Sequence, residues 1–273
     1  MPLSIRTWNL FHGNAKPPER QAFLEQMVRL ATSDSPDVLC LQELPVWALP
    51  ELGRWSGMHA FGDVAQPPRL GPFPGNAALG HALTSWNHGL LRSAFTGQGI
   101  AILLEPGADV LAHETLVLNA PAFREAQSRS LGLGLVARLA WAKERRIVQA
   151  VRARFAAFGT ALIANLHATG YGPDERLADA ELLRAACFAD GLAEPGDVCI
   201  LAGDFNAKAG RSATLAELGE RGWGFSPASE EGVDHVLVRG ARVSPPAHWP
   251  PERRVVAGRL LSDHAPLDLK AAA

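Results

Sequence analysis

The sequence is poor in cysteine, has no long apolar run and carries almost no excess of either charge. Its three cysteines, Cys40, Cys187 and Cys199, lack the close spacing of metal ligands, which indicates reduced thiols in a reducing compartment. No stretch reaches the ~18 consecutive apolar residues of a membrane-spanning helix. Residues 1–6 lack the basic and then apolar pattern of a signal peptide. These absences predict a cytoplasmic protein without a membrane span.

The charge balance limits the partners of the protein. The 26 Lys and Arg residues face 28 Asp and Glu residues, which leaves a formal net charge of -2. A protein that binds nucleic acid mainly through many phosphates needs a concentrated basic surface. The only basic concentration, Arg138–Arg154, is typical of a solvated strand pair, although it could border the path of an anionic substrate. Nothing in the sequence indicates an obligate protein partner.

Two nucleotide-binding motifs are also absent. The first strand is not followed by Gly-x-Gly-x-x-Gly, and no Gly-Lys-Ser/Thr of the Walker type occurs, so neither phosphate cradle is present. The composition, 47% hydrophobic and 20% charged, is that of a globular protein. A length of 273 residues fits one large domain or two ordinary ones.

The hydrophobic pattern predicts strands and helices in mixed order. Leu3–Asn9 alternates apolar and polar residues like a half-buried strand, and Pro17–Pro18 begins a helix that includes Phe23–Ala31. Further strands are predicted over 37–42, 99–104, 110–118, 146–155, 160–167, 197–202, 233–238 and 267–269, and further helices over 174–192 and 211–221. Residues 53–97 are predicted to form a long connection. This order suits two packed sheets with outer helices in a single domain, residues 1–273.

Polar residues follow apolar strands at six places. These are Trp8-Asn9, Gln42-Glu43, Asn165-Leu166-His167, Gly203-Asp204-Phe205-Asn206, Val233-Asp234 and Ser262-Asp263-His264. Strand ends present side chains at the rim of a rigid scaffold, so several of these clusters can meet at one site. Each cluster alone has a structural explanation as a cap or turn, whereas the combination indicates a function.

Three oxygen donors among these residues, Asn9, Glu43 and Asp263, favour a hard metal ion. Glu43 and Asp263 supply carboxylate oxygens and Asn9 supplies an amide oxygen, which are the ligands that Mg²⁺ prefers, with Mn²⁺ as a substitute. A structural zinc site would instead use thiolates and several imidazoles. The sequence therefore predicts a magnesium site that includes these side chains.

The remaining polar residues suit acid–base chemistry. Asp204 and Asn206 are two residues apart, so on extended backbone they would lie on one side and hold a water molecule. His264 would be oriented by a carboxylate such as Asp234. His167 offers a second imidazole that could protonate a leaving oxygen.

The motifs Trp-Asn, Leu-Gln-Glu, Asn-x-His, Gly-Asp-Phe-Asn, Val-Asp and Ser-Asp-His, in this order over almost the whole chain, resemble the endonuclease/exonuclease/phosphatase superfamily. The resemblance implies an α/β fold of the DNase I type, a four-layer α/β sandwich with two packed, mostly antiparallel sheets flanked by helices. It also implies Mg²⁺-dependent hydrolysis of a phosphoester by direct attack of water. Glu43 would be the principal metal ligand, with Asn9 and Asp263 assisting at the metal or the phosphate.

The same resemblance implies the roles of the other residues. Asp204 would orient or deprotonate the attacking water, and Asn206 would hold that water or the phosphate. His264, paired with Asp234, would contact the scissile phosphate. His167 stands where abasic-site repair nucleases of the superfamily carry Tyr and where DNase I-like, sphingomyelinase-like and many phosphatase members carry His.

The resemblance and the charge balance together favour a small-molecule or lipid-headgroup phosphoester as the substrate. The alternative is an endonuclease or exonuclease that acts on DNA or RNA, and a remote alternative is a non-catalytic binding module on the same fold. From Leu70 to Leu91 the chain has no Asp, Glu, Lys or Arg, and we expect this segment to form part of the cleft wall.

Several other residues have a simpler interpretation. His81 and His88 are seven residues apart, too far on one helix to share an ion. His12 is expected to be a loop histidine, although it follows Asn9 closely. Trp47 and Trp55 are expected to pack rather than to stack on bases.

Overall fold

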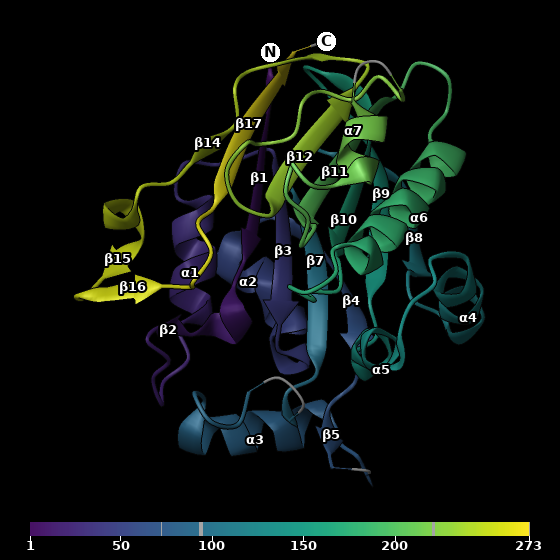
Figure 1. Cartoon of the computed structure of the whole chain (residues 1–273). Coiled ribbons are helices and arrows are strands. Elements are labelled where there is room, and N and C mark those ends of the chain that lie inside the picture. Colours follow the sequence, from purple (N-terminus) through teal and green to yellow (C-terminus); the bar gives the residue numbers. More distant parts are fainter. Residues whose placement is uncertain (72, 93–94, 220–221, 273) are drawn as a thin grey trace. The chain divides into compact units, whose positions relative to one another are not determined.

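A computed structural model describes residues 1–71, 73–92, 95–219 and 222–272 (Figure 1). The chain divides into two compact units. The central unit contains 1–2, 109–244 and 271–273, and the N-terminal unit contains Leu3–Ala108 and Pro245–Lys270. Each unit therefore uses separate stretches of the chain. The assignment of residues 1–273 to one domain stays a prediction.

The N-terminal unit is built on a sheet with one parallel pair. Its strands are β17 (Leu267–Ala272), β1 (Leu3–Asn9), β3 (Val38–Leu44), β7 (Gln98–Leu104) and β4 (His59–Gln66), in this order, with β14 (Ala247–His248) also on β17. The parallel pair is β1 and β3, which α1 (Leu24–Thr32) connects. Because parallel strands require a crossover, the helix lies against the sheet.

The apolar spacing of α1 determines which face it buries. Leu24, Met27, Val28 and Ala31 recur every three or four residues, and each is at most 2% exposed. They pack in one cluster with residues of β1, β3 and β7, including Leu41. The prediction that this helix begins at Pro17–Pro18 is wrong, because the helix begins at Leu24 after Phe23.

Residues 53–97 are not a structureless connection, which corrects the prediction. They contain most of α2 (Leu52–Ser56) together with β4, β5 (Arg69–Leu70), β6 (Phe73–Pro74) and α3 (Ala77–Asn87). Helix α3 is capped by Asn76, whose side chain accepts a hydrogen bond from the Leu79 N–H. The helix was not predicted because it has no charged face, and periodicity is weak when polar and apolar residues do not alternate.

Short elements complete the N-terminal unit. They are η1 (Phe11–Gly13), β2 (Ala15–Lys16), η2 (Val46–Glu51), η4 (Pro251–Arg254), β15 (Val255–Val256) and β16 (Arg259–Leu261). β16 pairs with both β15 and β2. This small sheet holds the chain that leads to Ser262, Asp263 and His264.

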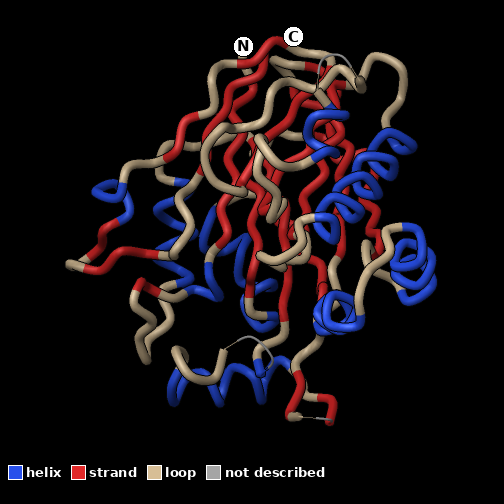
Figure 2. Tube along the Cα trace, in the orientation of Figure 1, coloured by secondary structure: helices blue, strands red, loops and turns tan. Residues whose placement is uncertain are grey.

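The central unit repeats the principle of a parallel pair in a sheet. Its strands are β12 (Asp234–Arg239), β11 (Val198–Asp204), β10 (Gly159–His167), β9 (Ile147–Phe155) and β8 (Asp109–Val117), in this order. β10 and β11 are parallel and are connected by α6 (Arg176–Leu192), which runs beside the strands in Figure 2. β13 (Arg242–Val243) pairs with the last residues of β17.

The strands of the central unit and helix α6 confirm the sequence predictions to within a few residues, whereas the other helices correct them. The basic run Arg138–Arg154 is not a strand pair, because α5 (Leu135–Lys143) covers its first part and only β9 covers its last. The helix α4 (Pro121–Ser130) was not predicted. On α6, Leu182 is fully buried whereas its neighbour Leu183 is 39% exposed.

The last helix of the central unit is shorter than predicted. The structure has α7 over Ala213–Leu218 within the predicted 211–221, and residues 220–221 of that prediction lie outside the described residues. Across the described ranges, no helix combines the length and the apolar content that crossing a membrane requires.

Candidate active site

The carboxyl ends of β1 and β3 bring two predicted metal ligands together in the N-terminal unit. Asn9 is the last residue of β1, and its register partner is Gln42, the neighbour of Glu43. The Asn9 Nδ2 donates to Glu43 Oε1 at 3.2 Å, and the Asn9 Oδ1 accepts from the Phe11 N–H at 2.9 Å. Asn9 therefore fixes the carboxylate of Glu43 while its own oxygen is fixed by the following turn.

His12 also belongs to this half of the site, although the sequence indicated only a loop histidine. Its side chain is almost buried, and its Nε2 lies 3.4 Å from Glu43 Oε2. Its carbonyl oxygen accepts a hydrogen bond from His88 Nε2 at 2.6 Å. Burial lowers the pKa of His88 to about 4, so this ring is neutral at physiological pH. The position of His12 depends on the turn after β1, which spacing alone does not predict.

The loop that carries Asp263 and His264 is fixed to the end of β1 through its backbone. Ser262 Oγ donates to the Asn9 carbonyl at 2.7 Å, and the Trp8 indole N–H donates to the His264 carbonyl at 3.0 Å. The buried Arg254 Nη1 donates to the carbonyls of Ser262 and His264 at 2.9 and 3.0 Å. Burial lowers the pKa of this guanidinium. The loop backbone is thus held in place, while Asp263 itself is exposed.

The carboxyl ends of β10 and β11 bring three predicted residues together in the central unit. His167 and Asp204 are register partners on the parallel pair, and Asp204 is also the partner of Asp234 on β12. His167 Nε2 lies 3.5 Å from Asp204 Oδ2, and Asp204 is only 2% exposed. The other Asp204 oxygen accepts from the Asn206 N–H at 3.0 Å.

Asn206 reaches Asp204 by a route other than the predicted one. β11 ends at Asp204, and Asn206 has a left-handed φ of 49°, so the two residues do not share one side of an extended strand. The Asn206 amide instead donates to the Ala168 carbonyl at 2.9 Å, which places it between the ends of β10 and β11. The premise of extended backbone was wrong, because the Gly-Asp-Phe-Asn motif turns immediately after the strand.

The glycine of that motif, Gly203, is required for steric reasons. Gly203 has a φ of 139°, and a Cβ at this position would lie 2.0 Å from the carbonyl oxygen of Leu166 on β10. Only glycine allows the two parallel strands to approach this closely. Gly203 therefore positions Asp204 beside His167.

Arg146 is a residue of this half-site that the sequence did not reveal. Its Nη1 lies 2.9 Å from His167 Nδ1, and its Nη2 forms an ion pair with Glu144 at 2.7 Å. A guanidinium only donates, so Nδ1 accepts and the proton of a neutral His167 ring is on Nε2, the nitrogen that faces Asp204. In the sequence Arg146 was one member of a basic run, and nothing distinguished it from its neighbours.

A buried acid supports the loop after β10. Glu181 on α6 accepts from the Thr169 N–H at 2.6 Å, from the Thr169 hydroxyl at 2.8 Å and from the Trp141 indole N–H at 2.5 Å. Burial raises the pKa of Glu181. The crossover helix thus holds the backbone two residues beyond His167.

Left-handed backbone is concentrated in these loops. Seven non-glycine residues of the described chain have positive φ, and five of them lie beside the predicted site residues: Phe11, His12, Glu43, Asn206 and Ser262. Such conformations cost of order 1–3 kcal/mol each and persist where the surrounding structure enforces them. Their concentration at these loops marks both half-sites as functional candidates.

The donor chemistry of the half-sites fits a divalent metal ion. In the N-terminal unit the Glu43 side chain is 20% exposed, so an ion could reach the carboxylate without unpacking the core. In the central unit Asp204 and Asp234 place two almost buried carboxylates on adjacent strands, and carboxylates in such surroundings stay ionised only with hydrogen bonds or positive charge beside them. Carboxylate and amide oxygens are donors that hard divalent cations prefer. Asp234 and His264 lie in different units, and their pairing stays a prediction.

Comparison with known proteins gives one family. A family model described as Endonuclease/Exonuclease/phosphatase family matches residues 7–264, which include both half-sites. A search of curated proteins finds no match.

Solved structures show the same fold. A functionally unknown conserved protein from Enterococcus faecalis V583 has a TM-score of 0.68 at 15% identity and covers 99% of this chain and 100% of its own. A mannosyl-6-phosphatase from Bacteroides thetaiotaomicron VPI-5482 has a TM-score of 0.65 at 16% identity, with coverage of 99% and 100%. TDP2 from Caenorhabditis elegans has a TM-score of 0.60 at 13% identity, with coverage of 100% and 76%. The predicted α/β fold of the DNase I type is confirmed.

Proposed function

The chain belongs to the endonuclease/exonuclease/phosphatase family, whose members are metal-dependent phosphoester hydrolases, and we propose that it hydrolyses a small-molecule or lipid-headgroup phosphoester with Mg²⁺. The observation that carries this proposal is the contact of Asp204 with both His167 and the Asn206 backbone, inside a family match that also includes Glu43. Both half-sites lie within the matched residues 7–264.

The N-terminal half-site holds the metal. Glu43 is the principal ligand, Asn9 orients its carboxylate through the amide and assists at the metal or the phosphate, and Asp263 is the third oxygen donor. When bound, Mg²⁺ acts as a Lewis acid on the phosphoryl oxygen and fixes the substrate. The His12 ring, with Nε2 3.4 Å from Glu43 Oε2, contacts the carboxylate oxygen that Asn9 does not bind.

The central half-site orients the attacking water. Asp204 is held by Asn206 and His167, so its carboxylate keeps one orientation and can accept a proton from water. Asn206 holds that water or a phosphate oxygen. His264, oriented by Asp234, donates to the phosphoryl oxygens as negative charge develops. His167 carries a proton on Nε2 and directs it, as a hydrogen-bond donor, to the Asp204 carboxylate or to the leaving oxygen.

The charge balance of the protein favours a small-molecule substrate over a nucleic acid. A net charge of -2 provides little attraction for a long polyanion. A mannosyl-6-phosphatase is among the proteins with the same fold, which supports the proposal only by likeness of fold. A non-catalytic module would be expected to lack Glu43, Asp204 or His264, and all three are present. The cytoplasmic location stays a prediction, supported by the reduced, buried thiols of Cys40 and Cys199.

A hydrolysis screen tests this proposal. The purified protein is offered sugar phosphates, inositol phosphates, phospholipids, nucleotides, single-stranded oligonucleotide and supercoiled plasmid, each with Mg²⁺, Mn²⁺ or a chelator. We expect turnover of a small-molecule or lipid phosphoester that the chelator abolishes.

The His264→Ala variant is the matched control. It should reduce that turnover by about 100-fold or more, because oriented acid–base groups typically contribute that much. Plasmid nicking at physiological salt with no small-molecule turnover would instead establish a nuclease. No detectable hydrolysis of any substrate would favour the non-catalytic binding module.

A further inference from the structure

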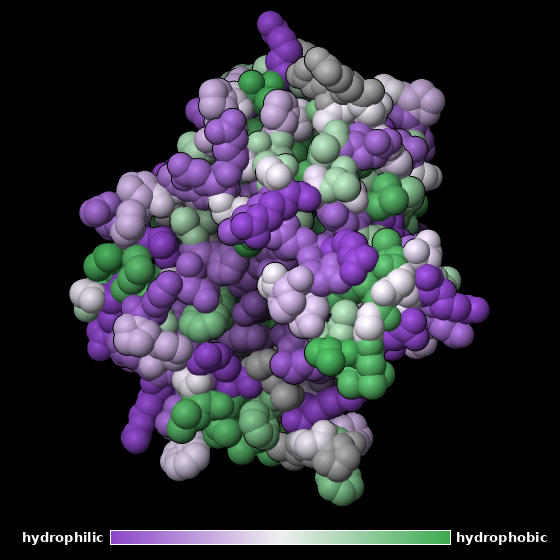
Figure 3. Space-filling model, in the orientation of Figure 1, coloured by the Kyte–Doolittle hydropathy of each residue, from purple (hydrophilic) through white to green (hydrophobic). Residues whose placement is uncertain are grey.

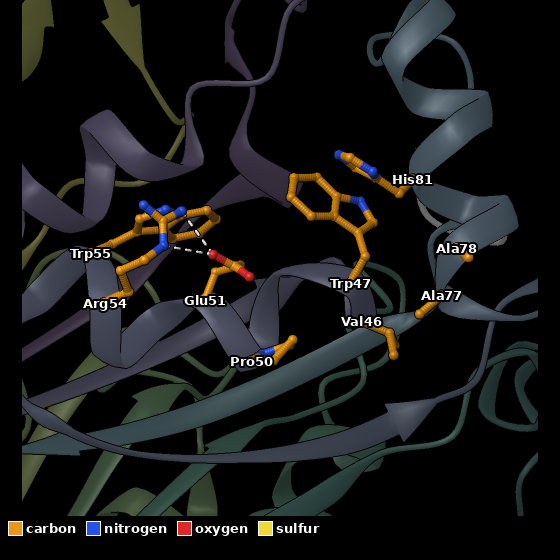
Figure 4. A pocket seen from close by; sticks show the side chains of 9 residues that line it. All are labelled: Val46, Trp47, Pro50, Glu51, Arg54, Trp55, Ala77, Ala78 and His81. Carbon is orange, nitrogen blue, oxygen red and sulfur yellow. Dashed lines mark hydrogen bonds and ion pairs between the residues drawn. The ribbon is translucent and has the colours of Figure 1, made fainter.

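The N-terminal unit contains a cavity that the proposed chemistry does not use. It has a volume of about 560 Å³ and is lined by η2, α2 and the first residues of α3. Figure 4 shows Trp47 reaching from η2 toward His81 on α3, with Glu51, Arg54 and Trp55 on the other side of the view. This volume is in the range of small-molecule sites, ~300–1,000 Å³.

A second cavity of about 430 Å³ adjoins the first. Trp47 and His81 line both, and their ring centroids are 4.4 Å apart. Arg20 and His88 lie in the lining of the second cavity. We call the two cavities together the Trp47 groove.

The Trp47 groove is connected to the predicted metal ligand Glu43 by a chain of contacts within the N-terminal unit. His88, in its wall, donates to the His12 carbonyl at 2.6 Å, and the His12 ring lies 3.4 Å from Glu43. Trp47 also follows Glu43 by only four residues along the chain. A substrate whose phosphate is at Glu43 therefore has the groove within reach of its remaining part.

The chemistry of the first cavity selects an uncharged but polar group. Its charged lining residues are Glu51 and Arg54, which form an ion pair at 2.7 Å and cancel each other. Their side chains are 40% and 63% exposed, so both an acceptor and a donor remain accessible at the rim. The rest of the lining is aromatic or aliphatic, including Trp47, Trp55 and Pro50.

We propose that the Trp47 groove binds a polyhydroxylated ring, a sugar or a cyclitol, that is esterified to the phosphate. The apolar C–H face of such a ring packs on the indole, and its hydroxyl groups bond to the carboxylate and guanidinium at the rim. This inference rests on the proposed function and names its substrate class. The ring comes either from a free sugar phosphate or from a lipid headgroup.

The segment without Asp, Glu, Lys or Arg explains why the first cavity of the groove does not compete for phosphate. Ala77, Ala78 and His81 of α3 form one wall of that cavity, and no Asp, Glu, Lys or Arg occurs between Leu70 and Leu91. Figure 3 shows hydrophobic residues in green over α3. The wall thus discriminates by shape and apolar contact, and the phosphate is left to the half-sites.

A nucleobase fits less well. Base recognition relies on an aromatic face for stacking together with amide or backbone groups that read the base edge. In the described lining of the groove only Gln21, in the second cavity, carries a side-chain amide, so the groove offers few side-chain groups to read a base edge.

The experiment compares Trp47→Ala with wild type on four substrates. These are a hexose 6-phosphate, phosphatidylinositol in phosphatidylcholine vesicles, a nucleoside monophosphate and p-nitrophenyl phosphate. We expect kcat/KM on the hexose phosphate or on phosphatidylinositol to fall about tenfold or more, because an aromatic contact and its buried area are lost. Turnover of p-nitrophenyl phosphate should change less than about twofold. The substrate whose kcat/KM falls in Trp47→Ala shows whether the ring belongs to a free sugar phosphate or to a lipid headgroup.

Two controls keep the result interpretable. Phe73→Ala removes an aromatic ring that is 69% exposed in the same segment and is absent from the lining of the groove, so it should leave all rates unchanged. Trp47→Phe should recover most of the ring-substrate activity. If no phosphoester is turned over, the proposed function fails, and saturation-transfer NMR with hexose 6-phosphate and with inositol phosphate still tests the groove.

Three outcomes would overturn the proposal. The first is a loss of kcat/KM on p-nitrophenyl phosphate that equals the loss on the ring substrates, which would mean that Trp47 has a packing role. The second is a loss of kcat/KM on the nucleotide alone. The third is a saturation-transfer signal of the ligand's ring protons that is the same with wild type and with Trp47→Ala.

Discussion

The two units use one backbone arrangement to present different polar residues. Each contains a parallel strand pair connected by a helix, β1–α1–β3 in one and β10–α6–β11 in the other, and each places polar residues at the carboxyl ends of that pair. Ligands of α/β sheets bind at these ends because the loops there converge. In the N-terminal unit the acid is Glu43, one-fifth exposed, whereas in the central unit it is Asp204, 2% exposed.

This difference in exposure suits the two roles proposed for these acids. A carboxylate that exchanges a metal ion with solvent must be accessible, and its partners here are an amide and an imidazole. A carboxylate that orients a water molecule must instead keep one direction, and burial with a backbone N–H and an imidazole provides this. The same helix-connected strand pair therefore carries an accessible carboxylate in one unit and a buried carboxylate in the other.

The largest effect is expected in the central unit. Asp204→Asn keeps the shape of the side chain but removes the charge that accepts the proton of water, and kcat should fall by about 10³-fold. The Mg²⁺ concentration required for half-maximal activity should stay within about twofold of wild type. Steady-state kinetics over a Mg²⁺ titration measure both quantities. A tenfold or smaller loss of kcat would contradict the role of Asp204.

A smaller and different effect is expected for the open carboxylate. Glu43→Gln removes one charged oxygen donor, so the Mg²⁺ requirement should rise by about 100-fold while saturating Mg²⁺ recovers part of the activity. Glu51→Gln, an exposed acid farther along the chain, is the matched control and should not change the Mg²⁺ requirement. If added Mg²⁺ restored Asp204→Asn instead of Glu43→Gln, the assignment of the two half-sites would be reversed.

Much of this arrangement could be predicted from the sequence because its signals are local. The alternation in Leu3–Asn9 gives β1 with the observed bounds, and strands β7 to β12 lie within a few residues of the predicted ranges. The acids and amides at strand ends follow from the same patterns. Helix α3 was missed because a helix without a charged face has no strong periodicity.

The unpredicted parts of the candidate site depend on contacts between distant residues. Arg146 meets His167 across neighbouring strands, 21 residues apart, and its sequence neighbours include other arginines. His12 meets Glu43 only because the turn after β1 adopts a left-handed φ of 54°. Neither the register of two strands nor a strained turn is encoded in residue spacing.

Lowering the pH should reduce the free energy of unfolding through His88, which supports His12 in the N-terminal half-site. Burial lowers the pKa of His88 from 6.5 to about 4, so between these values the unfolded chain binds a proton that the folded chain does not. The contribution of His88 to stability is therefore complete above pH ~6.5 and is lost as the pH falls. Between pH 7.5 and pH 5 the free energy of unfolding should fall by about 2 kcal/mol from this residue alone.

His88→Gln isolates this contribution. The glutamine amide can still donate to the His12 carbonyl but does not titrate, so the pH dependence of its urea unfolding should be about 2 kcal/mol smaller than that of wild type over the same range. His59→Gln replaces an exposed histidine of the same unit and should retain the wild-type dependence. Equal pH dependence in wild type and His88→Gln would show that His88 is not held neutral by burial. The central unit has no corresponding weakness at Glu181, because burial raises the pKa of that acid and protonation at low pH removes a buried charge.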